Sequence, residues 1–208
     1  MHARRLYAHR GAAAERPENT LPSFERALEI GVDALEMDVN VTRDGQLIVV
    51  HDETAARTAG APLAWSSLDL ADAQRLDVGW GLVASDGTRP FAGKGIHVPR
   101  FADVLDAFRD VIINVDIKSD PRAAKLIVEL VREHRAEDRV TIASFAQRQI
   151  AAVRALGYRG ETALAQPEVA SLLALPALLW KQLPFNGTAA QVPTHAGPLR
   201  FDRAAFIA

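Results

Sequence analysis

The 208-residue chain contains no cysteine, which excludes a disulfide framework and thiolate chemistry and leaves the cellular compartment open. Aromatic residues make up only 6% of the chain and the formal net charge is -2, so no basic surface suggests a nucleic-acid partner. The first residues carry arginines but no apolar core of a signal peptide. The default expectation is therefore a cytoplasmic protein, and the sequence does not specify its oligomeric state.

Long hydrophobic runs are also lacking. The longest, Val169–Trp180, contains Pro176 and is too short to cross a membrane, so we expect no stable membrane insertion. We interpret this run as a buried helix and loop, and a weak contact with a membrane edge is the alternative.

Hydrophobic residues nevertheless form 49% of the sequence, enough for one sizeable domain with a buried core. Apolar strand segments alternate with helical ones, which predicts a parallel sheet with helices outside it. A (β/α)8 barrel needs eight strands. We count seven: Arg5–Ala8, Val32–Val41, Gln46–Val50, Val111–Lys118, Val140–Phe145, Thr162–Ala165 and Ala189–Val192.

We therefore expect one α/β domain over residues 1–208, a TIM (β/α)8-type barrel that lacks its last strand and helix in this chain. Glycine and proline are frequent at about 53–100, which predicts an insertion over a binding face. The expected helices are one between a cap at Asn19 or Thr20 and Gly31, then Leu68–Leu76, Phe101–Phe108, Pro121–His134, Gln147–Leu156 and a start at Arg203–Ile207.

Charged side chains collect where the predicted strands end. Glu36 and Asp38 alternate on one strand and so share a face, and two adjacent carboxylates are costly unless a cation lies between them. His51 follows a second apolar strand, and His9-Arg10 follows a third. Two carboxylates, two imidazoles and a guanidinium predict metal-assisted hydrolysis of a phosphate ester.

Short motifs extend this pattern in a fixed order. The chain closely resembles glycerophosphodiester phosphodiesterases in His9-Arg10-Gly11, Pro17-Glu18-Asn19-Thr20, Glu36-x-Asp38-Val39, Thr42-x-Asp44-Gly45 and His51-Asp52. Asn114-x-Asp116-x-Lys118 resembles a further element of that family, and the likeness continues more loosely through Thr141–Phe145.

The resemblance implies roles for eight residues. Glu36, Asp38 and Asp116 are implied ligands of one divalent cation, Ca²⁺ or Mg²⁺, although the family more often has Glu where this chain has Asp116. His9 and His51 are the implied acid/base pair. Arg10 and Lys118 are expected to bind phosphate, and Glu18 is a weaker ligand or an orienting group.

The implied substrate is a small-molecule glycerophosphodiester, and the products are glycerol 3-phosphate and an alcohol. Attack by water and attack by a neighbouring glycerol hydroxyl through a cyclic phosphate both stay open. So do a lipid phosphodiesterase of phospholipase C or D type and an inactive, truncated fragment.

Individual residues also have plainer interpretations. Arg10 could merely pair with Glu36 or Asp38, and Lys118 could be a surface lysine. Phe145 and Trp80 are interpreted as core or pocket wall, and His97, His134 and His195 are assigned no chemistry.

Overall fold

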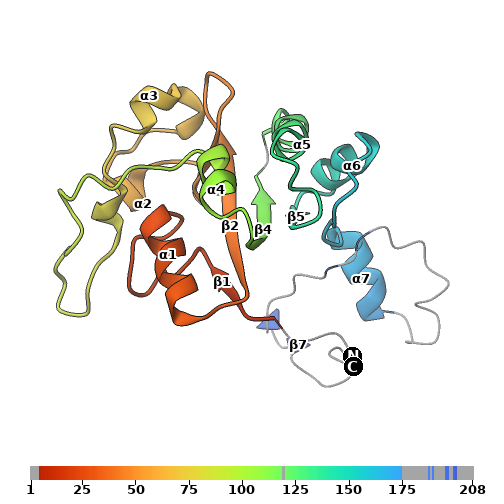
Figure 1. Cartoon of the computed structure of the whole chain (residues 1–208), viewed down its shortest axis with the longest axis horizontal. Helices are drawn as coiled ribbons and strands as arrows, with labels where there is room; N and C mark the ends of the chain where they lie inside the picture. Colours follow the sequence, from red (N-terminus) through yellow and green to blue (C-terminus); the bar gives the residue numbers. More distant parts are fainter. Residues whose placement is uncertain are drawn as a thin grey trace.

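The computed structural model describes residues 5–118, 120–174, 187, 189, 195–196 and 199–200. Its centre is a sheet with parallel strands in the order β1-β2-β4-β5 (Figure 1). These strands are β1 (Tyr7–His9), β2 (Ala34–Val41), β4 (Ile112–Ile117) and β5 (Val140–Ala143). The predicted strand positions are confirmed within two residues at each of their ends.

Strand β3 (Leu47–Val49) differs from the prediction. It pairs antiparallel with the end of β2, so it is a hairpin arm and not a further parallel strand. The connection over residues 42–46 is a tight turn, in which the Gln46 amide donates to the Thr42 hydroxyl at 2.9 Å. A parallel crossover needs a dozen or more residues, so this short connection permits only the antiparallel arrangement.

Beyond β5, the parallel order continues as single bridges. Ile142 pairs with Thr162 and Ala163 pairs with Ala189, where full strands were predicted at Thr162–Ala165 and Ala189–Val192. Residues 190–192 and the expected helical start at 203–207 lie outside the described residues. The antiparallel pair β6 (His195–Ala196) and β7 (Leu199–Arg200) was not predicted.

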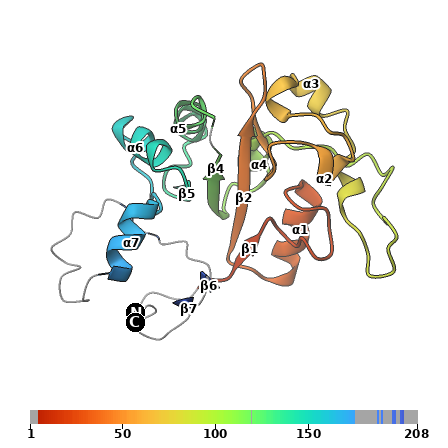
Figure 2. The same cartoon turned by 180° about the vertical axis from the view of Figure 1, so that it is seen from behind.

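Helices connect the parallel strands. Helix α1 (Leu21–Ile30) begins after Thr20 and ends at Gly31, whose φ of 96° is in the left-handed region, as its position predicted. The others are α4 (Phe101–Ala107), α5 (Ala123–Glu133), α6 (Gln147–Ala155) and α7 (Gln166–Ala174), of which α5 and α6 pack side by side (Figure 2). Among the described residues, no helix is long and apolar enough to cross a membrane.

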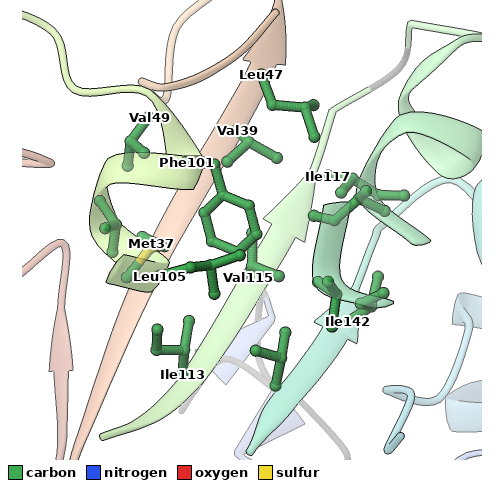
Figure 3. Packing of buried hydrophobic residues seen from close by; sticks show 14 of the residues in the cluster. Met37, Val39, Leu47, Val49, Phe101, Leu105, Ile113, Val115, Ile117 and Ile142 are labelled. Carbon is green, nitrogen blue, oxygen red and sulfur yellow. The ribbon is translucent and has the colours of Figure 1, made fainter. Parts of the chain in front are cut away.

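The main core lies between the sheet and these helices. Phe101 and Leu105 of α4 pack against Met37 of β2 and Val115 of β4 (Figure 3). Phe101 is fully buried, and burial of such a side chain contributes about 1.5–3 kcal/mol. The core thus fixes β2 and β4 side by side, and these two strands carry most of the predicted carboxylates.

Residues 53–100 form a folded layer beside α1 and away from α5 and α6 (Figures 1 and 2). This layer contains α2 (Ala56–Ala59), η1 (Trp65–Ser67), α3 (Leu70–Ala73) and η2 (Val78–Gly81), so the helix predicted at 68–76 is shorter and has a 3-10 turn before it. Trp65, Val78 and Val98 make a second hydrophobic cluster with Ile48 of β3 and Val50, which directly follows β3. This apolar cluster packs the layer against the edge of the sheet.

Candidate active site

The parallel register places the predicted site residues next to one another. His9 at the end of β1 lies opposite Glu36 of β2, and Asp38 of β2 lies opposite Asp116 of β4. Side chains two residues apart on a strand share a face, so Glu36 and Asp38 project from the same side of β2. The site therefore forms at the carboxyl ends of the strands, where barrel enzymes hold their chemistry.

The turn after β1 has an unusual backbone. Arg10 has a φ of 58°, and its amide donates to the backbone oxygen of Glu36 at 2.9 Å and to Glu36 Oε2 at 3.1 Å. Gly11 follows with a φ of 78°, and a Cβ there would lie 2.8 Å from the carbonyl carbon of Ser23. Strain of this kind persists only where the surrounding contacts fix it. The His-Arg-Gly motif is thus explained by a turn that brings Arg10 over β2.

Buried carboxylates meet two cations at this point. Asp38 is only 3% exposed, and its oxygens lie 3.2 Å from Arg10 Nε and 2.7 Å from Lys118 Nζ. Lys118 Nζ also pairs with Asp116, so it lies between the two aspartates. Arg10 does pair with Asp38, as the plainer interpretation held, whereas the interpretation of Lys118 as a surface lysine is wrong.

The cluster has more negative charge than these contacts neutralise. Burial, followed by the nearby Asp38 carboxylate, raises the pKa of Glu36 to about 7. Burial likewise raises the pKa of Asp116 despite the opposing effect of Lys118. Burial by itself would lower the pKa of Lys118, but Asp116 and Asp38 outweigh it and the net direction is upward. One oxygen of Asp116, Oδ1, is buried and has no hydrogen-bond partner.

These observations bear on the implied cation. Oxygen-only donors suit Ca²⁺ or Mg²⁺, and an unpaired carboxylate oxygen together with a carboxyl of elevated pKa indicates unmet negative charge. In the described part of the chain, however, no three histidine, aspartate or glutamate side chains are grouped closely enough to hold a metal. The carboxylate oxygens are thus the right chemical type of ligand for a hard cation. In the structure, however, Lys118 lies between Asp38 and Asp116.

The two histidines are held in different ways. His51 Nδ1 lies 2.7 Å from Asp52 Oδ1, and because a carboxylate only accepts, Nδ1 carries the proton. Asn40 supports the backbone here by donating to the carbonyl oxygens of Val50, His51 and Asp52. The His9 side chain is 70% exposed, and its Nε2 lies 3.9 Å from Glu36 Oε2. The partial burial of the ring, followed by Arg10, nevertheless lowers the pKa of His9.

Glu18 is bound by arginines. Its Oε1 accepts from Arg10 Nη1 at 3.1 Å, and both of its oxygens accept from Arg57 at 2.7 Å. Burial would raise the pKa of Glu18, but Arg57 and Arg10 together lower it. Of the two predicted roles, this geometry matches the orienting group.

A cavity of about 600 Å³ opens beside these groups. Its lining includes His51, Asp116, Lys118, Ser144 and Phe145. Phe145 is 63% exposed, so the prediction of a pocket-wall position is confirmed for it and a core position is not. The cavity has space for a small phosphodiester next to an imidazole and an ammonium group.

Several side chains of the site were not predicted. Asn19 was interpreted only as a possible helix cap, yet its amide donates to Asp38 Oδ2 at 3.1 Å. Asn40 shares the alternation of Glu36 and Asp38 on β2, a signal that could have identified it. Arg57 gives no such signal, because its partner Glu18 is 39 residues away in sequence.

The remaining candidates lie elsewhere. Trp80 lies in the layer of residues 53–100, where Arg89 Cζ stacks over its ring at 3.5 Å from the ring centroid. His134 Nδ1 contacts the backbone oxygen of Leu130 on α5. Trp80 does not line the cavity, so a pocket-wall position is not confirmed for it there, and His97 and His134 do not line the cavity either.

Parallel strands, outer helices and charged groups at the carboxyl ends of the strands define an α/β protein of the TIM-barrel type. The family model described as "Glycerophosphoryl diester phosphodiesterase family" matches residues 9–180, and the chain belongs to this family.

Sequence relatives and solved structures agree with this family membership. A glycerophosphodiester phosphodiesterase of Caldanaerobacter subterraneus is 35% identical over 146 residues, which cover 67% of this chain and 57% of that protein. A glycerophosphoryl diester phosphodiesterase domain from Mycobacterium tuberculosis has a TM-score of 0.75 at 18% identity, over 82% of this chain and 63% of that one. A protein from Silicibacter pomeroyi, described as a glycerophosphoryl diester phosphodiesterase, has a TM-score of 0.67 at 30% identity, over 76% and 63%. The chain thus spans about three fifths of the length of these proteins.

Proposed function

We propose that this protein hydrolyses glycerophosphodiesters to glycerol 3-phosphate and an alcohol, with the help of one divalent cation. The observation that carries the proposal is the meeting of buried Asp38 and Asp116 with Arg10 and Lys118, beside a cavity that His51 lines. The name of the Caldanaerobacter relative supports the same substrate class.

The cation would be held by Glu36, Asp38 and Asp116, which requires these carboxylates to draw closer together than they lie in the structure and Lys118 to leave its position between the two aspartates. A cation held there would supply Lewis-acid chemistry, polarising the phosphate oxygens and lowering the pKa of an attacking oxygen. The shorter Asp116 is compatible with this role because its Oδ1 is buried and has no hydrogen bond.

Arg10 and Lys118 supply the positive charge for the phosphate. A phosphodiester anion repels an incoming nucleophile, and donors placed at the non-bridging oxygens offset the charge that develops in the transition state. The planar guanidinium of Arg10 suits two phosphate oxygens, and Lys118 borders the cavity. Glu18 keeps Arg10 in place from the other side.

His9 and His51 move the protons. One accepts a proton from the attacking oxygen, and the other donates a proton to the leaving alkoxide. The lowered pKa of His9 favours its neutral form, which suits the base. We assign the acid role to His51: its Nδ1 is committed to Asp52, so Nε2 is the ring nitrogen that would donate to the leaving alkoxide.

A direct assay tests the proposal. The purified chain is mixed with glycerophosphocholine and either Ca²⁺ or Mg²⁺, and released glycerol 3-phosphate is measured. We expect metal-dependent turnover that His9→Ala and His51→Ala each abolish, while His134→Ala, a histidine remote from the cavity, retains it. Unchanged turnover in His9→Ala and in His51→Ala would contradict the proposed function.

Two further measurements distinguish this function from a lipid phosphodiesterase and from an inactive fragment. Lysophosphatidylcholine micelles in place of glycerophosphocholine test the lipid phosphodiesterase, which would prefer the micelles. A folded chain that turns over neither substrate with either metal would favour the inactive fragment. The cytoplasmic location stays a prediction from the sequence.

A further inference from the structure

Four side chains of alternating charge and the imidazole of His51 form a continuous bridge across the site. Arg10 contacts Glu18, Glu18 contacts Arg57, Arg57 contacts Asp52, and Asp52 contacts His51. The two ends of this bridge are the proposed phosphate-binding cation and the proposed acid/base imidazole. Its middle member, Arg57, comes from α2 in the layer of residues 53–100.

Arg57 uses its whole guanidinium fork in this bridge. Nη1 and Nη2 each donate to one oxygen of Glu18 at 2.7 Å, and Nε donates to Asp52 Oδ2 at 2.6 Å. A planar group with fixed donor directions sets the orientation of both carboxylates, which a lysine ammonium cannot do. Because Oδ2 of Asp52 accepts from Arg57, the other oxygen, Oδ1, faces Nδ1 of His51.

The support beneath Arg57 is closely packed. A Cβ on Gly81 would lie 2.7 Å from Thr58 Cα, so η2 and α2 pack backbone against backbone. A Cβ on Gly60, at the end of α2, would lie 3.1 Å from the ring of Trp80. The layer of residues 53–100 thus holds α2 in one place, and with it the base of the Arg57 side chain.

We propose that Arg57 is a positioning residue, which locks Asp52 so that His51 keeps its proton on Nδ1 and presents Nε2 to the substrate. The expected effect on kcat depends on the proposed function, whereas the expected effect on the His51 tautomer does not. Arg57 itself does not touch the substrate in this account, because it acts through Asp52. The layer of residues 53–100 thereby takes part in catalysis by holding an orienting group.

The test compares two arginines of the full-length chain. Arg57→Ala removes the bridge. Arg43→Ala is the matched control, because Arg43 forms a similar two-donor pair with Asp69 at 2.9 and 2.6 Å, at the edge of the same layer and without contact to either histidine. Arg57→Lys keeps the charge but loses the fork.

Kinetics give the first readout. With glycerophosphocholine, we expect Arg57→Ala to lower kcat about 10- to 100-fold with KM changed less than about threefold, since a misplaced catalytic group costs about 10²-fold in rate. We expect Arg57→Lys to lower kcat as well, and Arg43→Ala to keep it within about twofold. Equal kcat values for Arg57→Ala and the parent would overturn the proposal.

A second readout does not depend on turnover. Correlation spectra of ¹⁵N-histidine-labelled protein report which ring nitrogen carries the proton, and the His51 signals are assigned by their loss in His51→Ala. We expect the Nδ1-H form in the parent and in Arg43→Ala, and a mixture of both tautomers in Arg57→Ala and Arg57→Lys. An unchanged His51 tautomer in folded Arg57→Ala would contradict the positioning role even if kcat fell.

The two readouts keep the two proposals distinct. If the parent shows no turnover, the proposed function fails, while the spectra still decide whether Arg57 fixes His51. If Arg57→Ala melts far below the parent, Arg57→Lys supplies the same comparison in a variant that keeps the charge.

Discussion

The carboxyl of Glu36 should weaken the fold above neutral pH when no metal is present. Its pKa is about 7 in the folded protein against an ordinary value of 4.5, because it is buried near Asp38. Between these two values the folded state retains a proton that the unfolded chain has lost, so stability falls as the pH rises. The penalty is complete above pH 7, and the difference corresponds to about 3 kcal/mol.

Glu36→Gln removes this penalty and keeps an oxygen that can accept from the Arg10 amide. In EDTA at pH 8, the variant should be more stable than the parent by about 3 kcal/mol, which is about 6–12 °C in Tm for a domain of this size. At pH 4, where Glu36 is protonated in both states, the two proteins should melt together. Glu25→Gln, which makes the same change at an exposed position of α1, should leave Tm unchanged at both pH values.

The same pair of proteins reports on the cation. If Glu36 is a ligand of the proposed cation, Ca²⁺ or Mg²⁺ should raise the Tm of the parent at pH 8 more than that of Glu36→Gln, because only the folded state brings the carboxylates together. A Glu36→Gln variant that melts below the parent in EDTA at pH 8 would refute the reasoning, because it would mean that the carboxylate is already neutralised by its neighbours.

Three further substitutions test the packing that supports the site, each by thermal melts and by turnover of glycerophosphocholine. Gly11→Ala should cost about 2 kcal/mol or more and lower kcat, because a Cβ at this positive φ would lie 2.8 Å from the backbone of Ser23; full activity would show that the turn can relax. Gly81→Ala should cost about 1–3 kcal/mol and lower kcat by displacing α2 at Thr58, although Gly81 is outside the cavity; lost stability with unchanged kcat would separate α2 from catalysis. Phe101→Ala should cost about 3–5 kcal/mol, since Phe101 is fully buried over the sheet, and a loss below 1 kcal/mol would contradict the described core.

Local signals were enough for most of the parallel sheet and its helices. Apolar runs marked β2, β4 and β5, and Gly31 marked the end of α1, because each of these signals is contained within a few residues. The orientation of β3 was missed although its short turn was visible. The five-residue connection over residues 42–46 is too short for a parallel crossover and should have excluded a parallel partner. The apolar pattern at Thr162–Ala165 predicted a full strand, whereas only single bridges form there, at Thr162 and Ala163, because a local pattern does not report how many backbone pairs a neighbour supplies.

Part of the candidate site could likewise be predicted from local sequence signals, and part could not. Glu36, Asp38 and Asn40 follow the alternation of one strand, so their common face is readable from the sequence. The ion pairs of Lys118 with Asp38 and of Arg57 with Glu18 join residues that are 80 and 39 positions apart, respectively. Such pairs depend on the register between β2 and β4 and on the packing of the layer of residues 53–100, which composition does not reveal.

The most direct test is a crystal of this chain grown with Mn²⁺ and glycerol 3-phosphate, in which anomalous scattering locates the metal. Mn²⁺ accepts the same carboxylate ligands as Mg²⁺ and Ca²⁺. We predict one anomalous peak in contact with Glu36, Asp38 and Asp116, with the phosphate beside it against Arg10, Lys118 and the two imidazoles. No peak at these carboxylates, or a phosphate bound away from His9 and His51, would contradict the account.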